Sequence, residues 1–390
     1  MRVLLTLLLV LSCAALPARA QQAGPTPDAF RADALSIEPL INARYAYLDR
    51  FPGEVMPMSA VLRAEAEAVG DRRSLLRYAE RAVAVLADHH AITGSSFNDS
   101  WGLVPSYSDL WIEPEGAVWR ITAVREESPA AQAGVRTGDS LVAVGATPTS
   151  DAVAAFWADL GLAPDGDRAG YAARVLAAGR RDRPRDLTIR SADGAERRLT
   201  LPNLYEAGPG DRPPLTAQES DGVRVIRFND SLGDSRTIAA FDAAMAGARP
   251  GQPVVLDLTD TPGGGNTVVA RAIMGWFVDA PTAYQIHRLP EEERQTGVPR
   301  QWIEQVLPRP GKRHDGLVTV RVGRWTGSMG EGLAVGFDAI GARVTGDPMA
   351  GLLGAIFDHP LPGSGLVIKL PTERLYAVDG TPRESFVPDR

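Results

Sequence analysis

The sequence is poor in residues on which several common kinds of site depend. Its 390 residues include one cysteine, Cys13, and two lysines, Lys312 and Lys369. A single cysteine excludes an internal disulfide and a cluster of thiolate metal ligands. The net charge of −7 argues against a nucleic-acid partner. Beyond the N-terminus no run reaches about 18 apolar residues, so we expect no transmembrane segment in the mature chain.

The first 20 residues have the pattern of a secretory signal. Arg2 precedes an apolar run, and residues 18–20 (Ala-Arg-Ala) form a small-x-small cleavage site. Cleavage there would remove Cys13 and leave no thiol in the mature chain. We therefore expect export to a periplasm or to the medium. A lipid anchor on Cys13 is the alternative, and residues 10–12 fit its pattern imperfectly.

The remaining length and composition indicate a soluble globular protein of two or three domains. Hydrophobic residues make up 44% of the chain and charged residues 23%. Residues 21–36 are polar and contain prolines, so we expect a frayed start. Residues 37–86 repeat apolar side chains at helical spacing and end at the pair His89-His90. Residues 21–110 are thus predicted to be an N-terminal helical segment.

Residues 204–390 alternate between strand-like and helix-like segments. Strands are expected at residues 223–228, 253–258 and 317–322, and helices at residues 237–246, at 268–277 and after 328. Such alternation is typical of an α/β core with a parallel or mixed sheet.

The segment WTGSMGEGLAVGFD (residues 325–338) places Ser328 between glycines where a strand gives way to a helix. Unpaired N–H groups and the positive end of the helix dipole meet at such a junction. This position suits a nucleophile that must turn a carbonyl oxygen into an oxyanion. A helix N-cap, completed as a capping box by Glu331, is the alternative interpretation.

A second candidate site is the segment DLTDTPGGGN (residues 257–266), which follows a buried strand. Consecutive glycines allow the backbone to approach a ligand closely and to point N–H groups at an anion. The segment lacks the GK[ST] ending of a nucleotide-binding loop, and no lysine is near. A plain turn remains the alternative.

Residues 111–203 form a further unit. The string SPAAQAGVRTGDSLVAVGATPT, which follows a short strand, resembles the signature of a PDZ domain. PDZ domains bind the C-termini of peptides by adding the peptide to a sheet as an extra strand. The resemblance implies a carboxylate-binding loop around Gly116, Ala117 and Val118. A generic β-rich insert is the alternative.

Taken in this order, the PDZ string, TDTPGGGN and TGSMGE resemble the tail-specific (C-terminal processing) serine peptidase family. This resemblance implies a core related to the crotonase and Clp protease fold, with a PDZ-like β-rich domain inserted before it. It further implies that Ser328 is the nucleophile and that the N–H groups of Met329 and of Gly263 or Gly264 hold the oxyanion. Thr259 and Thr261 depart from the family pattern.

The resemblance also indicates which base would act. One branch of the family uses a lysine about two dozen residues after the serine, but residues 349–354 carry leucine in its place. The tricorn-like branch uses a histidine before the PDZ domain and a glutamate near the C-terminus. His90 and Glu384 match these positions as general base and orienting carboxylate. His89 stands where that branch usually has a serine, a hydroxyl that Ser95 or Ser96 could supply instead.

We therefore expect an exported serine endopeptidase that acts on unfolded or C-terminally exposed polypeptides through an acyl-enzyme on Ser328. No cofactor is implied, and the adjacent histidines do not suit a metal site because their side chains diverge. The second hypothesis is an inactive, peptide-binding scaffold on a peptidase-like core. An α/β-hydrolase esterase with Asp347 and His359 is disfavoured, since Thr326 stands where the nucleophile elbow needs glycine.

Overall fold

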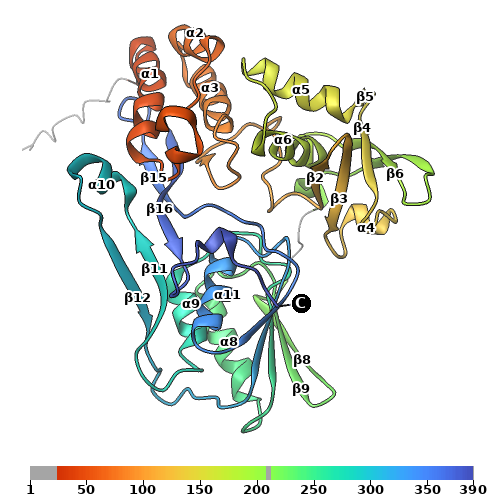
Figure 1. The fold of residues 1–390 in the computed structure, drawn as a ribbon, viewed down its shortest axis with the longest axis vertical. Coiled ribbons are helices and arrows are strands. Elements are labelled where there is room, and N and C mark those ends of the chain that lie inside the picture. Colours follow the sequence, from red (N-terminus) through yellow and green to blue (C-terminus); the bar gives the residue numbers. More distant parts are fainter. Residues whose placement is uncertain (1–23, 208–211, 390) are drawn as a thin grey trace, which may run out of the picture.

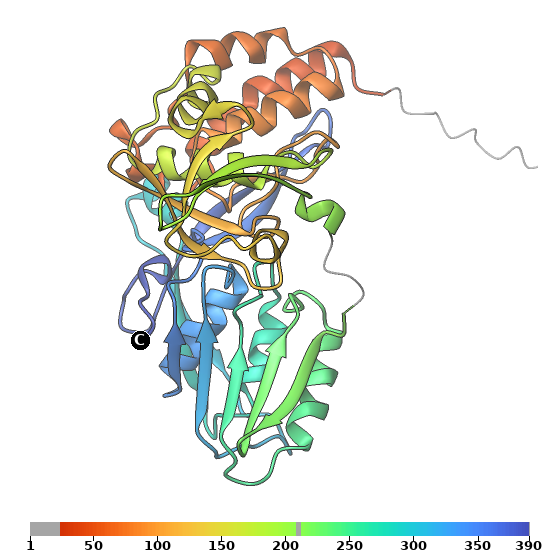
Figure 2. The same ribbon diagram turned by 90° about the vertical axis from the view of Figure 1, so that its right-hand side faces the viewer.

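The computed structural model describes residues 24–207 and 212–389, so the signal predicted for residues 1–20 lies outside the described residues. The described chain is a mixed α/β fold with three β-sheets, which confirms the predicted fold class. The N-terminal helices and the inserted module lie at one end of the molecule and the α/β core at the other (Figures 1 and 2). No helix in these residues has the length and apolar character that crossing a bilayer requires.

The N-terminal part consists of helices α1 (Pro27–Arg44), α2 (Ala60–Ala68) and α3 (Arg72–Ala84), with two short turns, η1 (Leu48–Arg50) and η2 (Pro52–Glu54). The expected frayed start is wrong from Pro27 onward. The side chain of Thr26 caps α1, and Pro27 occupies the first helical position, where no N–H is needed. The buried Asp33 carboxylate accepts the backbone N–H groups of residues 363 and 364, at 2.9 and 2.6 Å, and so anchors the helix.

The inserted module is built on an antiparallel sheet in the order β2-β3-β4-β6-β7, with β5 paired to β4. Its elements are β2 (Leu110–Glu115), β3 (Val118–Val124), α4 (Pro129–Gln132), β4 (Ser140–Val144), β5 (Thr147–Pro148), α5 (Thr149–Asp159), α6 (Asp167–Ala178), β6 (Arg185–Arg190) and β7 (Glu196–Leu201). Strand β2 lies at the edge of this sheet, and α6 packs beside it. The sequence did not predict β2 or α5.

The core sheet has the order β14-β13-β10-β9-β8, in which only β8 runs antiparallel to its neighbour. After the short helix α7 (Leu204–Ala207), its elements are β8 (Leu215–Ser220), β9 (Val223–Phe228), α8 (Arg236–Ala246), β10 (Val254–Asp257), α9 (Thr267–Met274), β13 (Val318–Val322), α11 (Met329–Ala339) and β14 (Arg343–Gly346). The predicted strands and helices of this region are present within a few residues of their expected ends.

A third sheet joins a short strand that follows the N-terminal helices to strands of the C-terminal half. Its order is β1-β16-β11-β12, with β15 also paired to β16. The elements are β1 (Ile92–Thr93), β11 (Thr282–Arg288), α10 (Pro290–Thr296), β12 (Gln301–Val306), β15 (Ala355–Pro360) and β16 (Val367–Tyr376), and the turn η3 (Arg383–Ser385) follows. Because β1 pairs with β16, the chain just after His90 is fixed against the C-terminal part of the protein.

Two hydrophobic cores meet at the loop that carries Ser328. Trp325, together with Ala350 and Leu352, belongs to the core formed by the N-terminal helices and the module. Met329 and Leu333 belong to the core beneath the α/β sheet. The Ser328 loop therefore lies at the boundary between the two halves of the molecule.

Candidate active site

The serine loop and the glycine-rich loop lie side by side because they leave adjacent parallel strands, β10 and β13. The backbone pairing continues past the ends of these strands. The N–H of Thr261 donates to the carbonyl of Trp325 at 2.9 Å, and the N–H of Gly327 donates to the carbonyl of Thr261 at 3.1 Å. A side chain at Gly327 would meet the Pro262 carbonyl oxygen at 2.9 Å, so this close approach requires glycine.

Ser328 adopts backbone angles that are strained for a residue with a side chain. Its φ is 52° and its ψ is −113°, immediately before α11. Such conformations persist where the surroundings hold them, and they cluster at functional sites. Here the Glu331 carboxylate accepts the Ser328 N–H at 2.8 Å. The serine does precede a helix, as the capping interpretation requires, but its hydroxyl also points to a distant partner.

That partner is His90, which is buried and lies 238 residues earlier in the sequence. Its Nε2 is 3.0 Å from Ser328 Oγ, and its Nδ1 is 2.7 Å from the carbonyl oxygen of Leu353. A carbonyl can only accept, so the neutral ring carries its proton on Nδ1. The lone pair of Nε2 then faces the serine hydroxyl, as a general base requires.

The surroundings of His90 favour its neutral form. Burial lowers its pKa to about 4, and the positive charge of Arg383 acts in the same direction. At neutral pH the imidazole is therefore unprotonated and available to accept a proton.

Glu384 does not make the orienting contact with His90 that the sequence led us to expect. One of its carboxylate oxygens is buried without a hydrogen-bond partner in the described structure. The neighbouring Arg383 donates to the carbonyl oxygens of Leu352 and Gly354, at 2.7 and 2.9 Å. These two bonds fix the loop whose intervening carbonyl, that of Leu353, orients the histidine ring instead.

A carboxylate that the sequence indicated only as part of a capping box joins both sides of the site. Glu331 is fully buried and, besides the Ser328 N–H, accepts the N–H groups of Gly351 and Leu352 at 2.8 and 3.2 Å. Burial raises its pKa to about 7, although Arg383 opposes this rise. Glu331 thus ties the serine loop to the loop that orients His90.

The oxyanion donors predicted from the sequence are not equivalent in the structure. Gly263 N–H already donates to the Asp230 carboxylate at 2.7 Å. A side chain on Gly264 would meet nothing within 4 Å, whereas one on Gly265 would collide with the Met329 side chain at 2.0 Å. The glycine loop therefore packs against the start of α11, where the N–H of Met329 lies, and Gly264 is the better candidate for the second donor.

The threonines that depart from the family pattern are bonded within their own loops. Thr259 Oγ1 donates to Asp257 at 2.6 Å, and Thr261 Oγ1 donates to the carbonyl of Leu258 at 2.7 Å. Thr326 Oγ1 donates to the same carbonyl at 2.8 Å. These bonds stabilise the turn, so the loop is ordered although Thr259 and Thr261 depart from the family pattern.

The other candidate bases have different partners. His89 stacks on Tyr171, with ring centroids 4.5 Å apart, and its Nε2 accepts a hydrogen bond from Arg174 at 3.0 Å. Lys312 pairs with Asp242 at 3.5 Å and Lys369 with Asp358 at 2.7 Å.

The remaining hydroxyls and histidine considered from the sequence also lie elsewhere. Ser96 accepts a hydrogen bond from Arg181, and the carbonyl of Ser95 accepts one from Thr93. His359 lies on β15, in the third sheet. In the described ranges, no group of His, Cys, Asp or Glu side chains is arranged to hold a metal ion.

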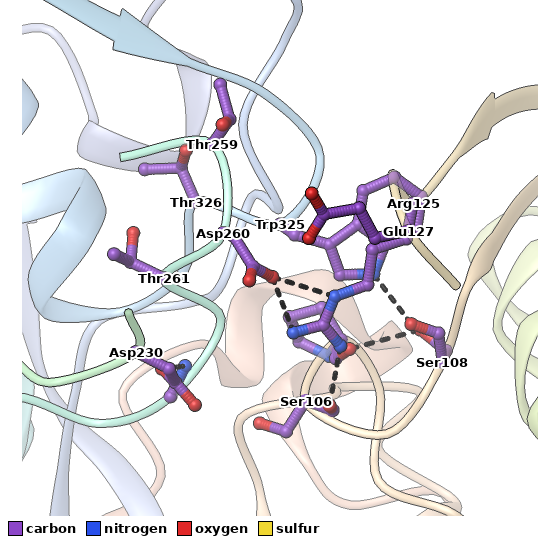
Figure 3. Close-up of polar contacts among 12 residues, drawn as sticks. Ser106, Ser108, Arg125, Glu127, Asp230, Thr259, Asp260, Thr261, Trp325 and Thr326 are labelled. Carbon is purple, nitrogen blue, oxygen red and sulfur yellow. Dashed lines mark hydrogen bonds and ion pairs between the residues drawn. The ribbon is translucent and has the colours of Figure 1, made fainter. Parts of the chain in front are cut away.

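The inserted module contacts both loops of the site directly (Figure 3). Arg125 donates to Asp260 from Nε and Nη2, at 2.9 and 2.7 Å. Arg324 pairs with Glu113 of β2 at 2.7 Å, and Trp325 Nε1 donates to the carbonyl of Ser108, just before the module, at 2.7 Å. A displacement of the module would therefore act on the glycine loop and on the serine loop together.

The predicted carboxylate-binding residues Gly116 and Ala117 form the exposed turn between β2 and β3, and Val118 begins β3. The strands at the edges of the module's sheet are β2 and β7, and α6 lies beside β2. Arg174 of α6 donates to the carbonyl of Ile112 on that edge at 3.2 Å. The role of residues 116–118 in binding a carboxylate stays a prediction.

Solved structures share this fold over nearly the whole chain. A photosystem II D1 C-terminal processing protease is 16% identical, with a TM-score of 0.55 over 92% of each chain. Mature CPAF in complex with lactacystin is 14% identical, with a TM-score of 0.55 over 93% of each chain. No family model matches the sequence, and no curated protein does either. The chain thus has the fold of the C-terminal processing proteases.

Proposed function

We propose that this chain is a serine peptidase in which Ser328 is the nucleophile and His90 the general base. The observation that carries the proposal is the 3.0 Å contact between His90 Nε2 and Ser328 Oγ, two atoms from segments 238 residues apart. Their approach in a fold shared with C-terminal processing proteases supports a peptidase over a capping serine.

In the reaction, His90 Nε2 accepts the Ser328 proton as Oγ attacks the peptide carbonyl carbon. The N–H groups of Met329 and Gly264 receive the oxyanion of the tetrahedral intermediate. The intermediate collapses to an ester on Ser328 while His90 returns its proton to the leaving amine. The same nitrogen then accepts a proton from a water molecule as the water attacks the ester. The bond between the carbonyl carbon and Oγ breaks, the acid leaves, and His90 returns the proton to Ser328 Oγ.

The substrates are polypeptides that are unfolded or have an accessible C-terminus. A peptide can add to a sheet only along an edge strand, and β2, with α6 beside it, is an edge strand of the inserted module. We propose that this module captures the substrate near its C-terminus and that the protein acts after export, as the pattern of residues 1–20 suggests.

The test is hydrolysis of casein by purified protein, together with labelling by a fluorophosphonate. Wild type is expected to cleave casein and to be labelled at Ser328, and Ser328→Ala is expected to do neither. Ser235→Ala is the matched control, since Ser235 also precedes a helix and its side chain caps nothing. Equal turnover by Ser328→Ala and wild type would reject the proposal.

A second candidate function is a peptide-binding protein on an inactive core. It is favoured by one observation, that the carbonyl of Leu353, and no carboxylate, bonds His90 Nδ1. Binding of C-terminal peptides without fluorophosphonate labelling of Ser328 would support this candidate.

A further inference from the structure

A cavity of about 710 Å³ lies between the inserted module and the core. Its module wall includes Arg125 and Glu127, with Tyr107 from the segment just before the module, and its core wall includes Asp230, Asp260 and Gly263. Gly263 directly precedes Gly264, the proposed oxyanion donor. The cavity therefore reaches the glycine loop one residue before the proposed oxyanion donor.

The positive side chains of this cavity are already engaged. Arg125 and Arg212 both bind the Asp260 carboxylate, Arg212 at 3.1 Å. Arg227 also approaches it, at 3.7 Å. Asp260 is thus surrounded by three guanidinium groups and has no charge to offer a ligand.

Asp230 differs, although it lies on a neighbouring loop of the same wall (Figure 3). Its Oδ1 accepts the N–H of Gly263, and within the described residues no Lys, Arg or His nitrogen lies within 4 Å of the carboxylate. Among the described residues none donates a hydrogen bond to Oδ2, which can therefore accept one from a ligand in the cavity. Burial raises the pKa of Asp230 and the charge of Asp260 adds to this rise, whereas the Gly263 N–H and the more distant charges of Arg125 and Arg212 act to lower it. A bound cation would likewise lower this pKa and stabilise the carboxylate.

The backbone presents this carboxylate in a fixed position. Asp230 has a φ of 54°, in the left-handed region that aspartate tolerates better than most residues. The residues on either side are held, since Asn229 N–H and Ser231 Oγ both donate to the carbonyl of Pro214, at 3.0 and 2.5 Å. A strained residue that its neighbours hold firmly is typical of a site organised before its ligand arrives.

We propose that this cavity is a substrate subsite for a lysine or arginine side chain on a residue flanking the scissile bond, with Asp230 as its charge partner. The inference rests on the proposed peptidase function and adds a substrate preference to it. The Asp230 carboxylate accepts the N–H of Gly263, which is next to the proposed oxyanion donor Gly264. A substrate side chain that reaches Asp230 would therefore belong to a residue close to the reacting carbonyl. An ammonium or guanidinium group of the substrate, bonded to Oδ2, would give Asp230 the ion-pair partner that it lacks among the described residues.

The test compares fluorogenic peptides that differ only at the residues flanking the cleaved bond, with lysine, arginine or norleucine. We expect wild type to prefer the basic peptides at one of these positions. Asp230→Asn keeps the shape and the bond to Gly263 while removing the charge. It is expected to lower the ratio of kcat/KM for lysine over norleucine about tenfold, while cleavage of the norleucine peptide changes less than about threefold.

Two further variants complete the comparison. Asp230→Gly suits a positive φ but removes both the carboxylate and the acceptor of the Gly263 N–H, so it is expected to lose the preference as Asp230→Asn does and, in addition, to lower the cleavage of all peptides. Asp221→Asn is the matched control, because Asp221 also has a positive φ (50°) and lies at the opposite end of β9. It is expected to keep the wild-type ratio.

The inference is overturned if wild type lacks a basic preference, or if Asp230→Asn changes cleavage of all peptides by the same factor in either direction. Such results with hydrolysis and Ser328 labelling intact reject the subsite alone. Absence of both hydrolysis and labelling in wild type rejects the proposed function, and the subsite with it.

Discussion

The serine side and the histidine side of the site are built in different ways. On the serine side, β10, β13 and α11 come from one part of the core, and backbone bonds between adjacent parallel strands hold their loops together. On the histidine side, the ring of His90 is oriented by a carbonyl 263 residues away, in a loop held by Arg383. Short motifs can specify the first arrangement, whereas the second depends on three separate segments folding correctly.

The largest expected effect tests whether the two sides act as one unit. Ser328→Ala and His90→Ala should each lower kcat/KM on a casein-derived peptide by about 10³-fold or more, because each removes one partner of the same proton transfer. The double variant should lose no more than the single ones. His359→Gln, which changes a histidine outside the site, should retain activity. Multiplied losses in the double variant would mean that the two residues act independently.

Glu331 connects the two sides, so its removal should destabilise both. In Glu331→Ala three buried or partly buried N–H groups lose their acceptor, and we expect a loss of roughly 3 kcal/mol in the free energy of unfolding. Urea unfolding at pH 7 measures this loss. A change below about 1 kcal/mol would show that the connection carries little stability.

Glu331→Gln tests the charge of the same residue. The folded protein raises the pKa of Glu331 from 4.5 to about 7, so the folded state holds this proton more tightly than the unfolded state. The stabilising contribution of the protonated form is present below pH 4.5 and is lost as pH rises through about 7. Wild-type stability should therefore fall more between pH 5 and pH 8 than that of Glu331→Gln. Parallel pH dependences would contradict the raised pKa.

A smaller effect concerns the histidine side alone. Because burial and Arg383 lower the pKa of His90 to about 4, the acid limb of kcat/KM should lie well below the ordinary histidine value of 6.5, and activity should persist at pH 5 to 6. His287 provides the contrast. Although burial acts to lower its pKa, hydrogen bonds with Glu304 and Glu373 raise that pKa to about 9. In His287→Gln the acid limb should not move, and a limb near pH 6.5 in wild type would contradict the lowered pKa.

The same contrast explains how much the sequence alone could predict. The core strands were predictable because they are short apolar runs between turn residues, and Ser328 and the glycine loop because their motifs are contiguous. Strand β2 was missed because its second half is polar and contains Pro114, which is uncommon inside a strand but tolerated at an edge. The start of α1 was predicted wrongly although Thr26 and Pro27 are local signals of a helix start. Only the contact that anchors the helix, through Asp33, is with a distant loop.

Two features of the site had no signal in the sequence. The group that orients His90 is a main-chain carbonyl, and every residue has one, so no residue type marks Leu353 for this role. The bond between Asp230 and Gly263 joins loops that follow different strands, so it becomes visible only once β9 and β10 are paired. For Glu384 the sequence carried a signal that the structure does not follow. The family pattern indicated that this carboxylate contacts His90, but the carbonyl of Leu353 makes that contact in the folded chain.

Glu384 therefore gives the smallest expected effect and the sharpest test of that difference. If the Leu353 carbonyl orients the histidine, Glu384→Gln should lower kcat no more than about tenfold, far less than Ser328→Ala, because the ring keeps its hydrogen bond and its tautomer. Arg383→Met should have the larger effect of the two, since it releases the loop that presents this carbonyl. Measurement of kcat for both variants decides the matter, with thermal melting as a check of folding. A loss in Glu384→Gln as large as that in Ser328→Ala would mean that the carboxylate replaces the carbonyl on His90 during turnover, and the histidine side would then rearrange when substrate binds.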